Sequence, residues 1–271
     1  MDCNFPLHIK DDHGRPMVVP CGKCIACRIA RVRDWSVRLL DESSCWDQSA
    51  FITLTYSNEN LPLTNCGKAT LVKSDLQKFF KRLRKALPYP IKYFACGEYG
   101  SETKTHRPHY HAIVFGLNPM DVDIVRDEWQ SGFVVVESVN IERIKYVCGY
   151  VEKKMFYNPS DNFSKGYGCL IPPFQLISQR LGIRHFDSHI DEYSYSLRKT
   201  VRGVSYSFPR YYLKKHPEFK ELMAVKSARA QQIEFENNYC AIMAGYSLIE
   251  SRLQRDHDLK AKSKIKKRGV L

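Results

Sequence analysis

The stretch "RPHYHAIVFG" (Arg107–Gly116) constrains the fold of this chain more than any other segment. Side chains alternate between the two faces of a β-strand, so His109 and His111 should project from one face and Tyr110 from the other. Ala112–Phe115 make both faces apolar, which is typical of a strand buried on both sides. Two imidazoles on one face at the edge of a packed core are either paired structural groups or metal ligands.

The chain carries a basic excess. Its 271 residues include 42 Lys or Arg and 29 Asp or Glu, for a formal net charge of +13. Residues 251–271 hold eight Lys or Arg against two Asp, so the rest of the chain is basic as well. We expect a phosphate-rich partner, and the charge on the body favours nucleic acid over an anionic membrane surface. The basic tail taken alone is equally compatible with a solvated end.

The composition is that of an ordinary globular protein, with 44% hydrophobic and 26% charged residues. No N-terminal segment resembles a signal peptide, and no apolar run approaches the length of a membrane span. We therefore expect a cytoplasmic protein without a membrane partner.

Ten cysteines in such a chain are expected to be reduced, so clusters among them point to metal rather than to disulfides. "PCGKCIACR" separates Cys21, Cys24 and Cys27 by two residues each, and a C-x-x-C turn lets two thiolates converge on one ion. The pattern is compatible with structural Zn²⁺. The candidates for a fourth ligand are Cys3, His8 and His13. The remaining cysteines are interpreted as small buried hydrophobic residues: Cys45, Cys66, Cys96, Cys148, Cys169 and Cys240.

Periodicity predicts the first elements. Residues 28–42 have the apolar stripe of an amphipathic helix, and "FITLTY" (Phe51–Tyr56) is rich in the residues that favour strands. Residues 74–87, "SDLQKFFKRLRKAL", predict a helix with Ser74 as its N-cap. The outer face of this helix is basic, and it is either solvated or lies along a DNA backbone. Its cationic residues are Lys78, Lys81, Arg82, Arg84 and Lys85.

Further elements follow along the chain. We expect strands at residues 91–100, 107–116 and 132–139, and helices at residues 121–130 and 142–157. Adjacent strands interrupted by helices indicate an α+β fold with a mostly antiparallel sheet and flanking helices.

We expect four parts in the chain. They are a cysteine-rich N-terminal arm (1–30), a core (31–157), a loop-rich extension packed on the core (158–215), and a C-terminal helical extension (216–271). The basic end of the last part, from Lys260 onward, is expected to be disordered.

The segment "YVCGYVEKK" (Tyr146–Lys154) adds a second constellation. Tyr146 and Tyr150 are four residues apart, so their hydroxyls share one face of a helix, and Lys153 lies near the same side. A tyrosine pair alone is usually core packing. Its coincidence with two histidines on a strand and with Glu98 on the preceding strand favours a chemical role.

These parts fit phosphodiester transesterification. Two imidazoles and a carboxylate would hold a hard divalent cation with positions open for phosphate oxygens, and phosphate chemistry favours Mg²⁺ or Mn²⁺. A tyrosine hydroxyl would attack in line and remain as phosphotyrosine, while the departing strand gains a free 3′-OH. A nearby lysine would stabilise the phenolate or position the phosphate.

The segments "FITLTY", "GEYG…RPHYH" and "YVCGYVEKK", in this order and spacing, resemble the three motifs of the HUH endonuclease superfamily of rolling-circle initiators. The closer resemblance is to replication initiation proteins of microviruses, small icosahedral single-stranded-DNA bacteriophages. "PCGKCIACR", "DLQKFFKRLRK" and "PRYYLKK" resemble the gokushovirus branch. The likeness covers most of residues 20–215. It implies a five-stranded antiparallel sheet with helices on one side.

The resemblance also implies a metal site. His109 and His111 would be the metal-binding pair and Glu98 the acidic third ligand. The chain departs from the superfamily at Tyr110, where a bulky aliphatic residue usually stands between the histidines. This side chain should face away from the metal.

The resemblance implies a role for each residue of the tyrosine motif. Tyr150 precedes Lys153 in the Tyr-x-x-Lys signature, so it is the first choice of nucleophile. Tyr146 matches the second tyrosine of two-tyrosine initiators. Lys153 would assist, and Lys154 would replace it in a slightly rotated helix.

The implied function is to nick the origin of a small circular phage DNA, free a 3′-OH for rolling-circle synthesis and later rejoin unit-length strands. The DNA would be single-stranded or supercoiled, in the cytoplasm of a bacterial host. Because no helicase P-loop motif is present, the protein would depend on host helicase and DNA polymerase. Two alternatives remain: a plasmid or transposon nuclease or relaxase of the same chemistry, and a non-catalytic zinc-knuckle nucleic-acid-binding protein.

Overall fold

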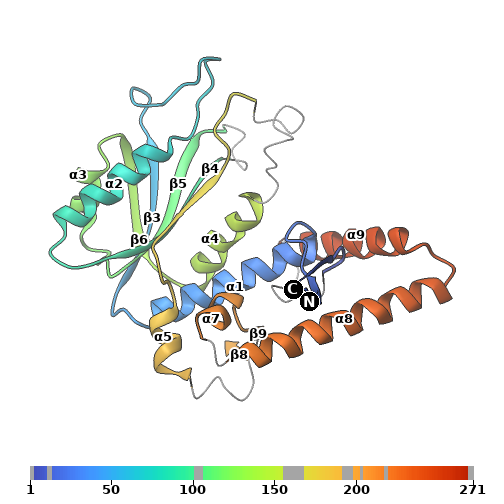
Figure 1. The fold of residues 1–271 in the computed structure, drawn as a ribbon. Helices are drawn as coiled ribbons and strands as arrows, with labels where there is room; N and C mark the ends of the chain where they lie inside the picture. The colour runs from blue at the N-terminus through green and yellow to red at the C-terminus, as the bar shows by residue number, and fades with distance from the viewer. Residues whose placement is uncertain are drawn as a thin grey trace. The chain divides into compact units, whose positions relative to one another are not determined.

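The computed structural model contains a five-stranded antiparallel sheet (Figure 1). The structure describes residues 3–10, 14–100, 106–154, 168–190, 198–201, 204–216 and 219–267. In spatial order the strands are β6 (Gly132–Ser138), β3 (Ser49–Tyr56), β5 (Pro108–Phe115), β4 (Lys92–Tyr99) and β7 (Phe174–Ile177). The predicted α+β fold with an antiparallel five-stranded sheet is confirmed.

The chain separates into two compact units. The sheet unit is Trp35–Ser207, and the helical unit combines Met1–Asp34 with Phe208–Leu271. The four-part division expected from the sequence stays a prediction.

One face of the sheet packs against two helices, α2 (Lys73–Ala86) and α3 (Val122–Glu128). Because β5 is the central strand, its side chains on this face are fully enclosed. The largest buried side chains of this layer are aromatic: Tyr56, Phe79, Phe80, Tyr110 and Trp129.

Helices also cover the opposite face of the sheet, as Figure 1 shows. Helix α4 (Ile141–Lys154) contacts β4 and β5, and α1 (Ile25–Ser43) places Trp35 against Phe94 with 4.9 Å between ring centroids. The implied arrangement with helices on one side only is therefore wrong. A central strand that is apolar on both faces needs a cover on both.

The start of α2 is held by tyrosines of the sheet and not by a side-chain cap. The helix begins at Lys73, Val72 occupies the N-cap position without a side-chain cap bond, and the prediction of Ser74 as N-cap is wrong. Instead, the Tyr110 hydroxyl accepts a hydrogen bond from the Val72 N–H at 2.9 Å and donates one to the Val72 carbonyl at 3.0 Å. These bonds give Tyr110, the departure from the superfamily pattern, a structural purpose on the face away from the histidines.

We expect Tyr110→Phe to lower the free energy of unfolding by about 1–3 kcal/mol, because the buried Val72 N–H loses its acceptor. Urea denaturation followed by circular dichroism measures the change. Tyr93→Phe is the matched control, because that ring stacks on Phe80 at 3.6 Å between centroids and removal of its hydroxyl leaves the stacking intact. Equal stability of the Tyr110→Phe variant and the wild type would contradict this role.

The region expected to be loop-rich supplies part of the sheet. Strand β7 pairs with β4 and completes the five strands. Helix α5 (Ile183–Ser188) and a hairpin of β8 (Arg198–Val201) and β9 (Val204–Ser207) follow.

The helical unit contains a hairpin of β1 (Leu7–Lys10) and β2 (Pro16–Val19), which the sequence did not indicate. It also contains α7 (Arg210–Lys215), α8 (Lys220–Met243) and α9 (Leu248–Lys267). Residues 216–259 are mostly helical, as expected. Helix α9 extends into the segment for which we expected disorder, and an ion pair of 3.0 Å joins Lys260 to Asp256 one turn earlier. Among the described residues, no helix has the length and apolarity of a membrane span.

The cysteines outside the N-terminal arm differ in burial. Cys96 and Cys148 are buried, as predicted, and Cys45 is half-buried. The prediction of buried residues is wrong for three that are exposed: Cys66, Cys169 and Cys240.

Candidate active site

Two neighbouring strands bring an acidic residue and both histidines of the motif together. Glu98 of β4 lies directly opposite His109 of β5 in the antiparallel register, and His111 follows two residues later on the same face. One oxygen of Glu98, Oε1, lies 2.9 Å from His109 Nε2 and 3.6 Å from His111 Nε2. Glu98 and His111 are buried, and His109 is half-buried. We call these three residues the His–Glu cluster.

The orientation of each imidazole is fixed from its other nitrogen. His109 Nδ1 donates to the backbone carbonyl of Arg107 at 3.0 Å, and His111 Nδ1 lies 3.0 Å from the Thr53 hydroxyl. With the proton of neutral His109 on Nδ1, its Nε2 lone pair faces the Glu98 carboxylate. Two acceptors at this distance are stabilised by a cation between them.

The His–Glu cluster fits a small hard cation. Adjacent ligands at about 2.1 Å from an octahedral ion stand about 3.0 Å apart, close to the separation of Glu98 Oε1 and His109 Nε2. The donor set of one carboxylate and two imidazoles suits Mg²⁺ or Mn²⁺ when phosphate oxygens complete the coordination. The residues present therefore fit the expected metal.

Helix α4 places both tyrosines of the motif against the His–Glu cluster. The Tyr150 ring stacks on His111 with 5.5 Å between centroids and 11° between planes, and the Tyr146 ring meets His111 edge-on at 5.3 Å. The two phenol rings are 5.0 Å apart. The four-residue spacing thus aligns them on one helix face, as predicted.

The two phenols differ in environment. Tyr150 is 5% exposed and Tyr146 is 49% exposed. Burial, and then a hydrogen bond with Glu98, raise the pKa of Tyr150 well above the ordinary range of a phenol. Tyr150 is therefore protonated at neutral pH unless positive charge is added nearby.

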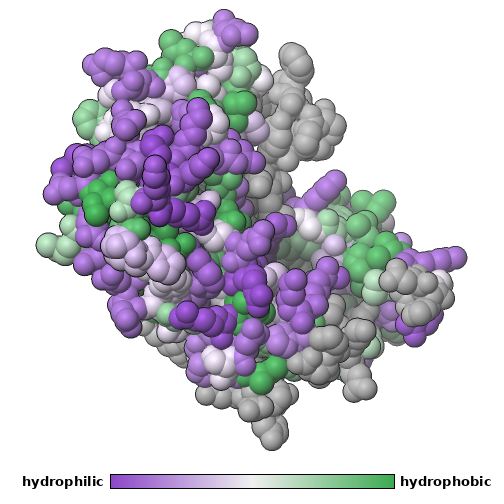
Figure 2. All heavy atoms as spheres, turned by 60° about the vertical axis from the view of Figure 1, so that its left-hand side comes forward, coloured by the Kyte–Doolittle hydropathy of each residue, from purple (hydrophilic) through white to green (hydrophobic). Residues whose placement is uncertain are grey.

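The other predicted site residues are placed less directly. Lys153 and Lys154 belong to the last turn of α4, and their side chains lie outside the described residues. The basic side chains of α2 lie across the sheet from the His–Glu cluster, because α2 packs on the face that carries Tyr110. Figure 2 turns the α2 and α3 side forward and shows hydrophilic side chains over much of it. Whether this basic face contacts DNA stays a prediction.

Comparison with known proteins bears on the whole arrangement. A family model for replication-associated proteins of the ORF2 type matches residues 49–155, the range from β3 to the end of α4. Replication-associated protein VP4 of Bdellovibrio phage phiMH2K is 29% identical over 266 residues, covering 80% of this chain and 78% of that protein. Replication-associated protein ORF2 of Spiroplasma virus 4 is 30% identical over 220 residues, covering 72% and 66%.

The chain belongs with the phage replication-associated proteins. The resemblance to microvirus replication initiators is thereby confirmed. Replication-associated protein ORF4 of Chlamydia phage 1 is also similar, at 28% identity over 258 residues, and the match covers 87% of this chain but 59% of that relative. No solved structure matches the chain.

In this replication-associated protein, sequence reasoning missed two residues that position His111. Thr53 contacts its Nδ1, and the Phe51 ring stacks on its other side with 5.5 Å between centroids and 18° between planes. Both lie in "FITLTY", which we had interpreted as structural. Alternation along that strand puts Phe51 and Thr53 on one face, and pairing with β5 places Thr53 opposite His111.

We expect Thr53→Val to weaken Mn²⁺ binding about 10–100-fold, because His111 loses the partner that fixes its ring. Thr53→Ser keeps the hydroxyl and should bind within a few-fold of the wild type. Titration of Mn²⁺ followed by electron paramagnetic resonance of the free ion measures both. Equal binding by the valine and serine variants would contradict a positioning role for the hydroxyl.

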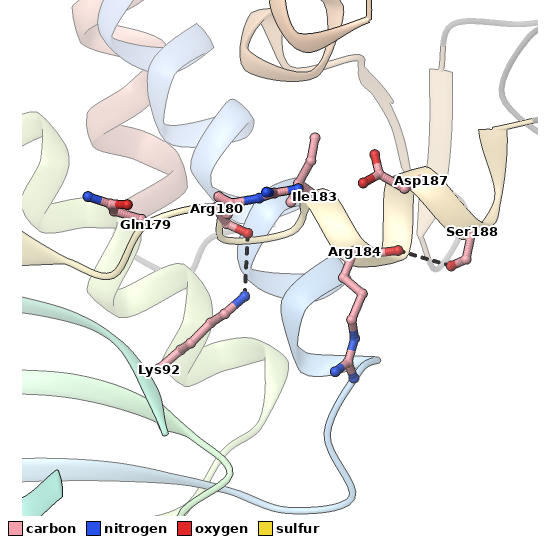
Figure 3. A pocket seen from close by; sticks show the side chains of 7 residues that line it. All are labelled: Lys92, Gln179, Arg180, Ile183, Arg184, Asp187 and Ser188. Atoms are coloured by element: carbon pink, nitrogen blue, oxygen red, sulfur yellow. Dashed lines mark hydrogen bonds between the residues drawn. The ribbon is translucent and has the colours of Figure 1, made fainter. Parts of the chain in front are cut away.

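A separate cavity of about 580 Å³ lies at the other end of β4 (Figure 3). Its lining is partly cationic, but Lys92 is paired with Glu42 at 2.9 Å and donates to the Arg180 carbonyl. Asp187 adds negative charge. Lys92 and Glu98 mark opposite ends of one strand, so this cavity is distinct from the His–Glu cluster.

Proposed function

We propose that this protein is a metal-dependent tyrosine endonuclease that nicks the origin of a small circular phage DNA and starts rolling-circle replication. The observation that carries the proposal is the stacking of Tyr150 on His111, while His111 and His109 share one oxygen of Glu98. A phenol beside a cluster of three metal-type ligands is the arrangement that phosphodiester transfer to tyrosine requires.

The His–Glu cluster would hold Mg²⁺ or Mn²⁺. When bound, the ion would neutralise charge on the scissile phosphate. Thr53 and the Arg107 carbonyl hold the imidazoles in position for this task.

The chemical step is a displacement at phosphorus. The phenolic oxygen forms a bond to phosphorus while the bond to the 3′-oxygen breaks, so the 5′-phosphate becomes attached to the protein. The phenol gives up its proton, and the departing 3′-oxygen takes one and becomes a free 3′-OH. Because burial favours the protonated phenol of Tyr150, positive charge from Lys153 or Lys154 would help to form the phenolate.

A second phenol in contact with the first supports a two-tyrosine cycle. Tyr146 lies beside Tyr150 and has greater access to solvent. In this cycle one tyrosine opens the origin and the other cuts after each round. The released 3′-OH then attacks the first phosphotyrosine and closes a unit-length circle.

The partners follow from this chemistry. The substrate would be single-stranded or supercoiled origin DNA in the cytoplasm of a bacterial host. Host helicase and DNA polymerase would separate and copy the strands, since the sequence contains no P-loop motif. A non-catalytic zinc-knuckle protein is the less favoured candidate, because it gives no reason for two tyrosines to pack on the His–Glu cluster.

The test uses the full chain and a pool of random-sequence single-stranded oligonucleotides, so no origin sequence is assumed. With Mn²⁺ we expect protein–DNA adducts that survive SDS, carry DNA at its 5′ end and share a short sequence. Excess chelator should remove the adducts. Adducts that persist in chelator, or a complete absence of adducts with Mn²⁺, would contradict the proposal.

A further inference from the structure

We propose that Cys3, Cys21, Cys24 and Cys27 form a structural zinc site in the helical unit, independent of the His–Glu cluster. The four sulfurs all lie within 4.8 Å of one another. Cys3 Sγ is 3.8 Å from Cys24 Sγ, and Cys21 Sγ is 4.0 Å from Cys27 Sγ. Four thiolates at about 2.3 Å from a tetrahedral zinc ion stand about 3.8 Å apart, which agrees with both distances.

Disulfides do not account for these distances. A disulfide requires sulfurs at about 2.05 Å, and all four cysteines are free thiols. Four thiolate ligands select zinc over the hard cations that suit the His–Glu cluster. Of the three candidates for the fourth ligand, the structure brings Cys3 to the group, whereas His8 Nε2 lies 3.3 Å from Glu234. His13 lies outside the described residues.

The backbone is arranged around the sulfurs as in a metal knuckle. Gly22 has φ +73°, and this left-handed conformation makes the tight turn between Cys21 and Cys24. The N–H groups of Lys23 and Cys24 both point to Cys21 Sγ at 3.4 Å, and the Cys21 N–H points to Cys3 Sγ at 3.3 Å. Backbone N–H donors that converge on sulfur stabilise thiolate over thiol.

The first turn of α1 completes the site. The Cys24 carbonyl accepts from the Arg28 N–H at 3.1 Å, so the helix starts directly after Cys24 and carries Cys27 in its first turn. The positive end of the helix favours a dianionic zinc–tetrathiolate group.

The site would tie three distant segments of the helical unit together. Cys3 comes from the N-terminal arm, the other three ligands come from the start of α1, and Asp256 of α9 caps the same helix end. Asp256 Oδ1 accepts from the Ile25 N–H at 3.0 Å and from Asn4 Nδ2 at 3.2 Å. Without the ion, the arm next to Cys3 is held chiefly by the short β1–β2 hairpin. The zinc is therefore structural and should add to the stability of this unit.

The test measures zinc in the full chain, expressed with zinc in the medium and purified under reducing conditions. We expect one zinc per chain by mass spectrometry of the metal, and loss of most of it in Cys24→Ser and in Cys3→Ser. Cys240→Ser is the matched control, because Cys240 is an exposed thiol of the same unit, and it should keep its zinc. The double variant His109→Ala with His111→Ala should also keep its zinc.

A second measurement does not depend on the folding of any variant. Wild-type protein reconstituted with Co²⁺ should show the intense visible bands of a tetrahedral cobalt ion and the near-ultraviolet charge-transfer bands of four thiolates. Zinc-free wild-type protein, zinc retained in both cysteine variants, or a cobalt spectrum without thiolate bands would overturn the proposal. None of these results depends on nuclease activity, so each is separate from a failure of the proposed function.

Discussion

Replacement of both Tyr146 and Tyr150 with phenylalanine is expected to abolish covalent attachment to DNA and to slow nicking on the order of 10³-fold or more. The variant lacks both phenolic nucleophiles but keeps the two rings that pack on His111 and Phe51. The fold should therefore persist while the chemistry is lost. An oligonucleotide recovered from the random pool, labelled at its 3′ end, gives both the adduct and the cleaved product on one denaturing gel.

The single variants divide the two roles. Tyr150→Phe should remove most of the first cut, because Tyr150 is the tyrosine of the Tyr-x-x-Lys signature and stacks on His111. Tyr146→Phe should leave the first cut and impair rejoining. Tyr239→Phe, an exposed tyrosine of α8, is the control and should match the wild type. Wild-type nicking by the double variant would remove tyrosine from the mechanism.

Removal of either histidine of the His–Glu cluster is expected to have the second large effect. His109→Ala or His111→Ala should weaken Mn²⁺ binding about 100-fold or more, and cleavage at limiting metal should fall in parallel. Non-specific DNA binding should be largely spared, because it depends on basic surface charge. Manganese titration, cleavage rate and filter binding to a random oligonucleotide separate the three quantities.

The control for this pair is His8→Ala, a change at an exposed histidine of the helical unit that should leave all three measurements unchanged. High Mn²⁺ concentrations should partly restore cleavage in the His109→Ala variant, since two ligands of the cluster remain. Cleavage by both histidine variants at the wild-type rate and the wild-type Mn²⁺ requirement would show that the cluster does not bind the catalytic ion.

Strand alternation and helix periodicity explain why so much of the candidate site was predictable. His109, His111 and Tyr110 are sorted to their faces by a period of two, and Tyr146 and Tyr150 are aligned by one helical turn. These are local rules, and strong hydrophobic patterns flank both motifs. The sharing of Glu98 required pairing between two neighbouring strands, which a single sequence does not specify.

The features that were missed depend on contacts between distant segments. Strand β7 has four residues, "FQLI", too few for a period to emerge, and it becomes a strand because the edge of β4 is available. The role of Thr53 depends on the register between β3 and β5. Ser74 has the chemistry of an N-cap, but the hydroxyl of Tyr110 already satisfies the backbone at the start of α2. Tertiary context overrides local propensity at each of these points.

Mapping the attached nucleotide tests the central claim most directly. After incubation with Mn²⁺ and the selected oligonucleotide, nuclease digestion and trypsin should leave a short nucleotide on the peptide "YVCGYVEK" (Tyr146–Lys153). Fragmentation should place most of the added mass on Tyr150 after the first cut and some on Tyr146 after longer reaction. Nucleotide on a peptide from any other part of the chain, or cleaved DNA with no peptide modified, would contradict the account.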